Sequence, residues 1–305
     1  MIQLLKKLFY FACFLPAFYL AGLMFFGDYA PNIKTNLSNY GYTAKRLSEA
    51  DTISKVDIIF VGSSHTYRGF DTRLFEIAGY KTFNLGTSNQ THIQTQMLLK
   101  QYIRKLNPKL VVYEVYPGTL QNDGVESSLD LIAHRKTSFE MFKMVTQVNH
   151  LLTYNSFFYK LLMPSEAKKD NDINISNDST DHYINGGFVE RENTNNTIFN
   201  NQPYSFTISK KQLKAFKLNL LFLKQQEIPF LLVMAPVTKT KFNNITNRLE
   251  IDSLYTGLGD YINYNYSILG LNDTIDFYDA HHLNQSGVIK FNQQLLKDLN
   301  EFSFE

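Results

Sequence analysis

The chain has 305 residues, 44% hydrophobic and 19% charged, a composition typical of a folded globular protein and not of a disordered or fibrous one. Its formal net charge is only +2, so the basic excess that nucleic-acid binding requires is absent. The single cysteine, Cys13, excludes an intrachain disulfide and a cysteine-based zinc site.

The N-terminal segment predicts a membrane anchor. Residues 8–26 contain no charged side chain, and with the next glycine the run reaches the ~20 residues that a helix needs to cross the bilayer. Two lysines precede it and an aspartate follows it, so we expect a cytoplasmic N-terminus and a periplasmic or extracellular main domain. A cleaved signal peptide is the alternative, but no small-x-small triplet closes the run. We predict a cytoplasmic stub and transmembrane signal anchor over residues 1–28 and a stalk over residues 29–54.

Residues 55–305 predict one domain of alternating strands and helices. Five short apolar runs rich in β-branched residues predict buried strands over Val56–Val61, Lys81–Leu85, Leu110–Val115, Phe230–Met234 and Thr274–Tyr278. Helical periodicity covers Gln90–Leu106, Ser209–Gln226 and Asn284–Leu299, with Asn284 as an N-cap. This alternation predicts an α/β fold, a three-layer α/β/α sandwich around a parallel sheet, preceded by one transmembrane helix.

One interval breaks the alternation. About a hundred residues, Pro117–Ile228, separate the third and fourth predicted strands, which is far more than a normal crossover, so we predict an insertion at about residues 119–205. Its first half, Ser127–Leu162, is helical by pattern, whereas Ser165–Gln202 is polar and rich in Asn and Asp. The second half is either a mobile loop or a flap near a ligand site, because it follows the carboxyl end of a strand.

The first motif that could carry chemistry is VGSSHTYRGF, residues 61–70. It places Ser64 after the first predicted strand, where a small turn exposes a hydroxyl at the carboxyl edge of the sheet. Alone, such a turn is an ordinary strand-to-helix connection. It is not the nucleophile elbow of α/β-hydrolases, because G-x-S-x-G requires glycine where this chain has Thr66.

The second motif is DFYDAHHLNQSG, residues 276–287. The carboxylate of Asp279 and the imidazole of His282 lie on one short loop, where they can orient each other and face a serine from another strand end. A surface metal site at His281 and His282 is the alternative, but zinc needs three or four convergent ligands and no HExxH-like spacing supplies them. We predict no metal ion, no cofactor, and a His281 side chain that points to solvent.

Together the two motifs resemble the SGNH (GDSL-like) hydrolase superfamily, in which a Gly-x-Ser follows the first strand and an Asp-x-x-His lies near the C-terminus. The resemblance spans Val56–Leu299 apart from the insertion. It implies a flavodoxin-like sheet, with Ser64 as nucleophile, His282 as base and Asp279 as its orienting carboxylate. Membrane-anchored, extracytoplasmic members linked to O-acylation of bacterial cell-surface polymers have a similar single N-terminal anchor.

The middle sequence blocks of that superfamily match less well. In the second block, Asn89 replaces a glycine whose amide is an oxyanion donor, so the resemblance implies an oxyanion hole made by the backbone N–H groups of Ser64 and Asn89. The third block, Glu114–Gly118, lacks the Asn side chain that is another donor. Loss of one such donor costs ~10²–10³ in rate.

Three further side chains are candidates for substrate binding. His65 and Arg68 flank Ser64 and are placed to hold an anionic group, and Tyr116 lies at a strand end where a sugar ring can stack. We therefore predict a serine-dependent acyl-ester hydrolase or O-acyltransferase acting on an acylated carbohydrate or another ester, with a membrane-bound O-acyltransferase as a candidate partner. The alternative is a non-catalytic SGNH-like binding or assembly subunit of a membrane-bound envelope-modification complex, which the missing Asn favours.

Overall fold

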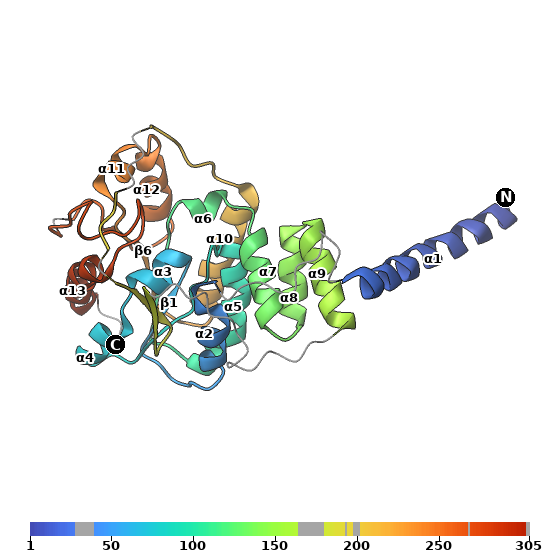
Figure 1. Cartoon of the computed structure of the whole chain (residues 1–305), viewed down its shortest axis with the longest axis horizontal. Coiled ribbons are helices and arrows are strands. Elements are labelled where there is room, and N and C mark those ends of the chain that lie inside the picture. The colour runs from blue at the N-terminus through green and yellow to red at the C-terminus, as the bar shows by residue number, and fades with distance from the viewer. Residues whose placement is uncertain (28–39, 164–179, 193, 198–201, 268, 303–305) are drawn as a thin grey trace.

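The computed structural model describes residues 1–27, 40–163, 180–192, 194–197, 202–267 and 269–302. Its centre is a five-stranded parallel sheet in the order β2-β1-β3-β6-β7 (Figure 1). The strands are β1 (Ile58–Val61), β2 (Thr82–Asn84), β3 (Leu110–Glu114), β6 (Phe230–Met234) and β7 (Tyr261–Asn263). This is the flavodoxin-like order, whose topological switch point lies between the first and third strands.

Helices cover both faces of the sheet. Successive strand residues point to opposite sides, and apolar residues on both sides need cover from water. Ile59 and Val111 belong to a core that includes α5 and α10, whereas Phe60 and Val112 belong to a second core that includes α13. The α/β/α sandwich is therefore as predicted. The helices of the body are α2 (Thr43–Ala50), α3 (Ser64–Gly69), α4 (Thr72–Ile77), α5 (His92–Leu106), α6 (Gly118–Gln121), α7 (Val125–His134), α8 (Phe139–Val148), α9 (Leu151–Leu162), α10 (Lys210–Gln225), α11 (Lys239–Asn243), α12 (Arg248–Thr256) and α13 (Gln285–Glu301), and a 3-10 turn, η2 (Tyr40–Tyr42), precedes α2.

The fifth predicted strand is wrong. The last strand of the sheet is β7, and residues 274–278 are irregular apart from one isolated bridge between Phe277 and Leu283. Side chains compete with a ladder here, since Asn272 Oδ1 accepts from the backbone N–H groups of Thr274 and Ile275 at 2.9 and 3.2 Å. The other four strands and the three predicted helices are present, and the Asn284 side chain caps α13 by accepting from the amide of Gly287 at 3.2 Å.

The insertion is more ordered than its composition indicates. Its first half forms α7, α8 and α9, as predicted. Its second half contains an antiparallel hairpin of β4 (Asp181–Ile184) and β5 (Phe188–Arg191), in which Phe188 and Val189 are fully buried. For these residues the prediction of a loose polar loop is wrong, while residues 164–179, 193 and 198–201 lie outside the described part of the chain.

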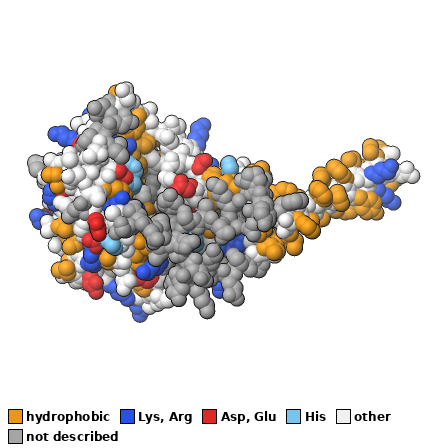
Figure 2. Space-filling view, viewed as in Figure 1, with side chains coloured by type: hydrophobic (Ala, Val, Ile, Leu, Met, Phe, Trp, Pro, Cys, Tyr) orange, Lys and Arg blue, Asp and Glu red, His pale blue; other side chains and the backbone are white. Residues whose placement is uncertain are grey.

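The helix α1 (Ile2–Phe26) projects from the body as a long rod and contacts α9 (Figure 1). Apolar side chains cover most of this rod, and Lys side chains lie near its N-terminal end (Figure 2). Within the described residues it is the one helix long and apolar enough to cross a membrane, and a signal sequence meets the same test. The retained anchor, its orientation and the division into anchor, stalk and α/β domain stay predictions, although α2, inside residues 29–54, packs into the core.

Candidate active site

Ser64 follows β1 at a bend that requires glycine. Gly62 has a φ of 148°, and a Cβ there would lie 2.8 Å from the carbonyl oxygen of Glu114. Because a side chain does not fit, Gly62 lets the ends of β1 and β3 approach closely before the chain turns into α3, whose first residue is Ser64. The Ser64 hydroxyl therefore lies at the carboxyl edge of the sheet, at the switch point between β1 and β3.

The structure brings Ser64, His282 and Asp279 together. Ser64 Oγ lies 2.8 Å from His282 Nε2, and His282 Nδ1 lies 2.7 Å from Asp279 Oδ2. An ionised carboxylate only accepts hydrogen bonds, so Nδ1 carries the ring proton and donates a hydrogen bond to Asp279. Nε2 is then the acceptor, and the Ser64 hydroxyl donates to it.

The loop before α13 holds this arrangement. Asp279 Oδ1 accepts from the backbone N–H groups of His281 and His282 at 2.8 and 2.7 Å, which closes a tight turn. Asn284 then starts α13 and also donates from its side-chain amide to the carbonyl of Ile275 at 2.6 Å. The three-residue spacing between the carboxylate and the imidazole is thus the spacing of one Asx-type turn.

The electrostatics suit proton transfer at His282. Burial lowers the pKa of His282, while the hydrogen bond and negative charge of Asp279 oppose that change, and the result lies below the usual value of 6.5. The ring is therefore neutral at pH 7 and able to take a proton. Burial would raise the pKa of Asp279, but its hydrogen bond with His282 and the positive charge that His282 can carry hold this pKa well below its usual range, so the carboxylate is ionised.

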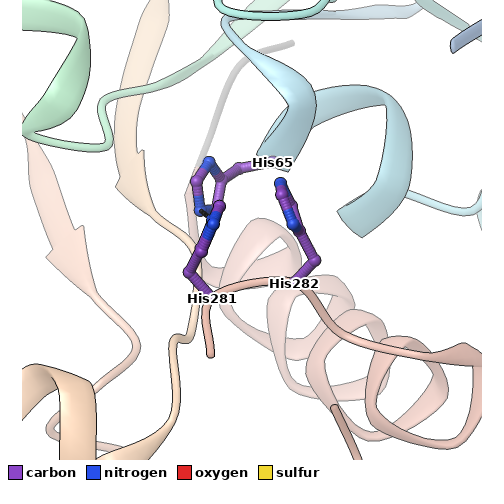
Figure 3. Close-up of side chains that lie close together, drawn as sticks. All are labelled: His65, His281 and His282. Atoms are coloured by element: carbon purple, nitrogen blue, oxygen red, sulfur yellow. Dashed lines mark hydrogen bonds between the residues drawn. The ribbon is translucent and has the colours of Figure 1, made fainter. Parts of the chain in front are cut away.

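His282 belongs to a cluster of three imidazoles, and the position of His281 in that cluster differs from our prediction. Figure 3 shows His65 from α3 and His281 and His282 from the loop before α13, with their rings close together. His281 Nδ1 lies 3.3 Å from His65 Nε2, so His281 points into the site and not to solvent. Tyr116, which follows β3, stacks on His65 with ring centroids 4.1 Å apart. The Asp-x-x-His pattern could not predict the inward position of His281, because that position depends on His65, more than two hundred residues earlier in the chain.

Arg68 does not present a free guanidinium to the site. It donates two hydrogen bonds to Asp181 of β4, at 3.0 and 2.8 Å, and Arg191 of β5 donates to the same carboxylate at 3.0 Å. The Arg68 and Arg191 side chains both lie over the ring of Tyr278, 5.3 and 4.9 Å from its centroid. Tyr278 is in turn nearly parallel to the ring of His282, with centroids 5.5 Å apart. Sequence reasoning missed this stack because the hairpin was not expected.

Asn89 is placed by its side chain at the surface. Its amide donates to Glu126 of α7 at 2.5 Å, and its φ of 48° lies in the left-handed region that Asn tolerates. The side chain is thus occupied elsewhere, and only the backbone N–H of this residue is available for the predicted oxyanion role.

A buried carboxylate lies beneath the imidazole cluster and was not predicted as part of the site. Glu114, at the end of β3, is 0% exposed, and burial raises the pKa of its carboxyl to about 8. Ser63 Oγ lies 3.4 Å from Glu114 Oε2 and 3.1 Å from His65 Nδ1. Glu114 therefore reaches His65 through one hydroxyl.

Comparison with known proteins leaves the family open. No protein-family model matches the chain, and no curated protein matches it. Among solved structures, a "putative acylhydrolase" from Bacteroides fragilis NCTC 9343 is 14% identical with a TM-score of 0.31, covering 87% of this chain and 99% of that one. A "GDSL-like lipase" from Bacteroides thetaiotaomicron VPI-5482 is 12% identical with a TM-score of 0.31, covering 85% and 98%.

Proposed function

We propose that the chain is a serine-dependent acyl-ester hydrolase or O-acyltransferase of the SGNH (GDSL-like) type. The observation that carries this proposal is the line of contacts from Ser64 Oγ to His282 at 2.8 Å and from His282 to Asp279 at 2.7 Å. A hydroxyl in reach of a neutral imidazole, itself oriented by a carboxylate, is an activated nucleophile.

In the proposed reaction, Ser64 Oγ forms a bond to the ester carbonyl carbon while its proton passes to His282 Nε2. Asp279 stabilises the resulting imidazolium. When the tetrahedral intermediate collapses, the bond to the alcohol breaks, and the alcohol leaves with the proton held by His282. Water or a sugar hydroxyl then attacks the acyl-serine with the same base, which releases the acid or a new ester and restores the serine. Hydrolase and transferase differ only in that acceptor.

The oxyanion of the intermediate needs hydrogen-bond donors, for which we propose the backbone N–H groups of Ser64 and Asn89. The end of β3 offers Glu114 and Tyr116 in place of an Asn amide. This difference favours the alternative function, a non-catalytic binding or assembly subunit of an envelope-modification complex.

We further propose that the domain acts outside the cytoplasmic membrane on an acylated carbohydrate or cell-envelope polymer, with a membrane-bound O-acyltransferase as partner. The apolar helix α1 supports this location, because it is long enough to hold the site near a membrane. The substrate class depends on the resemblance to membrane-anchored members of the superfamily.

The test is covalent labelling of the intact, detergent-solubilised chain with a fluorophosphonate, followed by peptide mass mapping. We expect one phosphonate, on Ser64, and no label in Ser64→Ala. Ser63→Ala is the matched control and is expected to be labelled still, because its hydroxyl points to His65 and Glu114. If the folded chain stays unlabelled, the enzyme proposal is wrong and the binding or assembly function replaces it.

A further inference from the structure

We propose that His65, His281 and His282 form a binding site for one divalent transition-metal ion such as Zn²⁺, and that the bound ion blocks the ester chemistry by occupying the His282 nitrogen that faces Ser64. The inhibition depends on the proposed function, whereas the metal site itself does not.

The ring nitrogens of the three histidines lie close enough together to share one metal ion. One nitrogen from each of the three rings lies within 4.8 Å of the others (Figure 3). In a tetrahedral zinc site, Zn–N bonds of about 2.0–2.1 Å separate the ligand nitrogens by ~3.3–3.4 Å. His65 Nε2 and His281 Nδ1 are already 3.3 Å apart, so they are spaced to share one ion. For His282, Nδ1 is held by Asp279 and Nε2 is the nitrogen left to coordinate.

Two of the three rings have the outer hydrogen bonds that metal-bound histidines normally make. The nitrogen opposite the ligating one usually donates to a carboxylate, a backbone carbonyl or water, which fixes the tautomer and orientation of the ring. His282 Nδ1 donates directly to Asp279 at 2.7 Å. His65 Nδ1 lies 3.1 Å from Ser63 Oγ, which leads to Glu114 at 3.4 Å.

Aromatic packing holds the rings in place before any ion binds. Tyr116 stacks on His65 with centroids 4.1 Å apart, and its plane is 13° from that of His281. The His281 and His282 ring centroids are 4.0 Å apart. Three imidazoles leave the fourth tetrahedral position for water, and imidazole ligands suit zinc and its neighbours more than magnesium or calcium.

Metal binding and serine activation compete for a single nitrogen. His282 Nε2 accepts the Ser64 proton in the proposed mechanism, and a nitrogen that coordinates an ion has no free lone pair to do so. The ion therefore removes the base without changing the fold, and a chelator restores it. Zinc would act as a reversible inhibitor and not as a catalyst.

The experiment uses the full chain in detergent, stripped with EDTA and dialysed, and measures Zn²⁺ binding by calorimetry. We expect one ion per chain. His281→Ala and His65→Ala should each weaken binding at least ~100-fold, since loss of a ligand exceeds the ~10–100-fold cost of losing an outer-shell partner. His182→Ala is the control, because this histidine is exposed on the hairpin and pairs with Glu192. Folding of each variant is checked by its melting curve.

Ester hydrolysis is then compared with and without Zn²⁺ within each variant. The hydrolysis rate of the intact chain should fall more than 10-fold in zinc and recover with EDTA. For His281→Ala, the ratio of the rates with and without zinc should stay near one. Ser64→Ala should bind the ion although it hydrolyses nothing, which separates failure of the metal site from failure of the enzyme proposal. The inference is overturned if the intact chain binds no stoichiometric ion, if the folded His65 and His281 variants bind as the intact chain does, or if zinc raises hydrolysis.

Discussion

Replacing Asp279 with Asn tests the proposed role of His282 most directly. The carboxylate accepts from the amides of His281 and His282 at 2.8 and 2.7 Å and from His282 Nδ1 at 2.7 Å. In Asp279→Asn, the remaining oxygen can keep the two amides, and the new NH₂ group then faces Nδ1. Because NH₂ only donates, the ring proton moves to Nε2, and the tautomer that accepts from Ser64 is lost.

The size of this loss follows from the change of tautomer. The equivalent exchange in serine hydrolases lowers kcat ~10⁴-fold, and we expect a fall of ~10³–10⁴, or about 4–5.5 kcal/mol of transition-state stabilisation. KM should change little, because Asp279 contacts His281 and His282 and is placed behind them, away from Ser64.

The assay is steady-state hydrolysis of a chromogenic aryl acetate in EDTA across the pH range. The Asp279 carboxylate opposes the burial that lowers the pKa of His282. Without the Asp279 carboxylate the pKa of His282 falls further, so the acid limb of the pH–rate profile moves to lower pH. The loss of kcat should persist at high pH. Asp260→Asn, at an exposed position, should keep the activity of the intact chain. A loss below tenfold, or one recovered at high pH, would refute the role given to Asp279.

Three further predictions concern stability. Burial raises the pKa of the Glu114 carboxyl from 4.5 to about 8, so the native state binds this proton more tightly than the unfolded state does. The unfolding free energy therefore falls as the pH rises between these two values. Urea titrations at pH 5.5 and 8.5 should show a smaller fall in Glu114→Gln than in the intact chain. Asp181→Asn leaves two guanidinium groups without their shared carboxylate and should cost ~2–3 kcal/mol, seen as faster hydrogen exchange in β4 and β5. Gly187→Ala, at φ 89° with its new Cβ 2.6 Å from the Asn84 carbonyl, should destabilise by at least ~2 kcal/mol, whereas Gly79→Ala, at φ 93° in open space, should cost less; equal thermal shifts would contradict the packing.

Regular elements were predictable where local pattern and burial agree. The buried strands β1, β3 and β6 read as apolar runs because both of their faces are covered. β7 was missed because Tyr261–Asn263 is short and half-buried, whereas Thr274–Tyr278 has a strand-like composition that side-chain hydrogen bonds from Asn272 override. Strand propensity does not account for side-chain hydrogen bonds that compete with the strand ladder for backbone N–H groups.

The candidate site also contains residues that local patterns predict and residues that they do not. Ser64 and the Asp279 to His282 turn were predictable as local motifs, and the structure brings them together. The expected cause, a strand that ends just before the turn, is wrong, because residues 274–278 are irregular. The inward position of His281 was not predictable, because it depends on His65 and Tyr116, which reach it from other elements. Periodicity describes one segment at a time and carries no information on these contacts.

The hairpin in the insertion bears on how the proposed base is held. Arg68 belongs to the helix that begins with Ser64, and its partner Asp181 belongs to β4, so one partly buried ion pair joins the nucleophile helix to the insertion. Arg68 also lies over Tyr278, whose ring is parallel to His282 within 5°. The base is therefore packed on one side by a residue that the hairpin helps to fix. A loose loop would not supply that support, which is why the described part of the insertion is better understood as a positioning element than as a mobile flap.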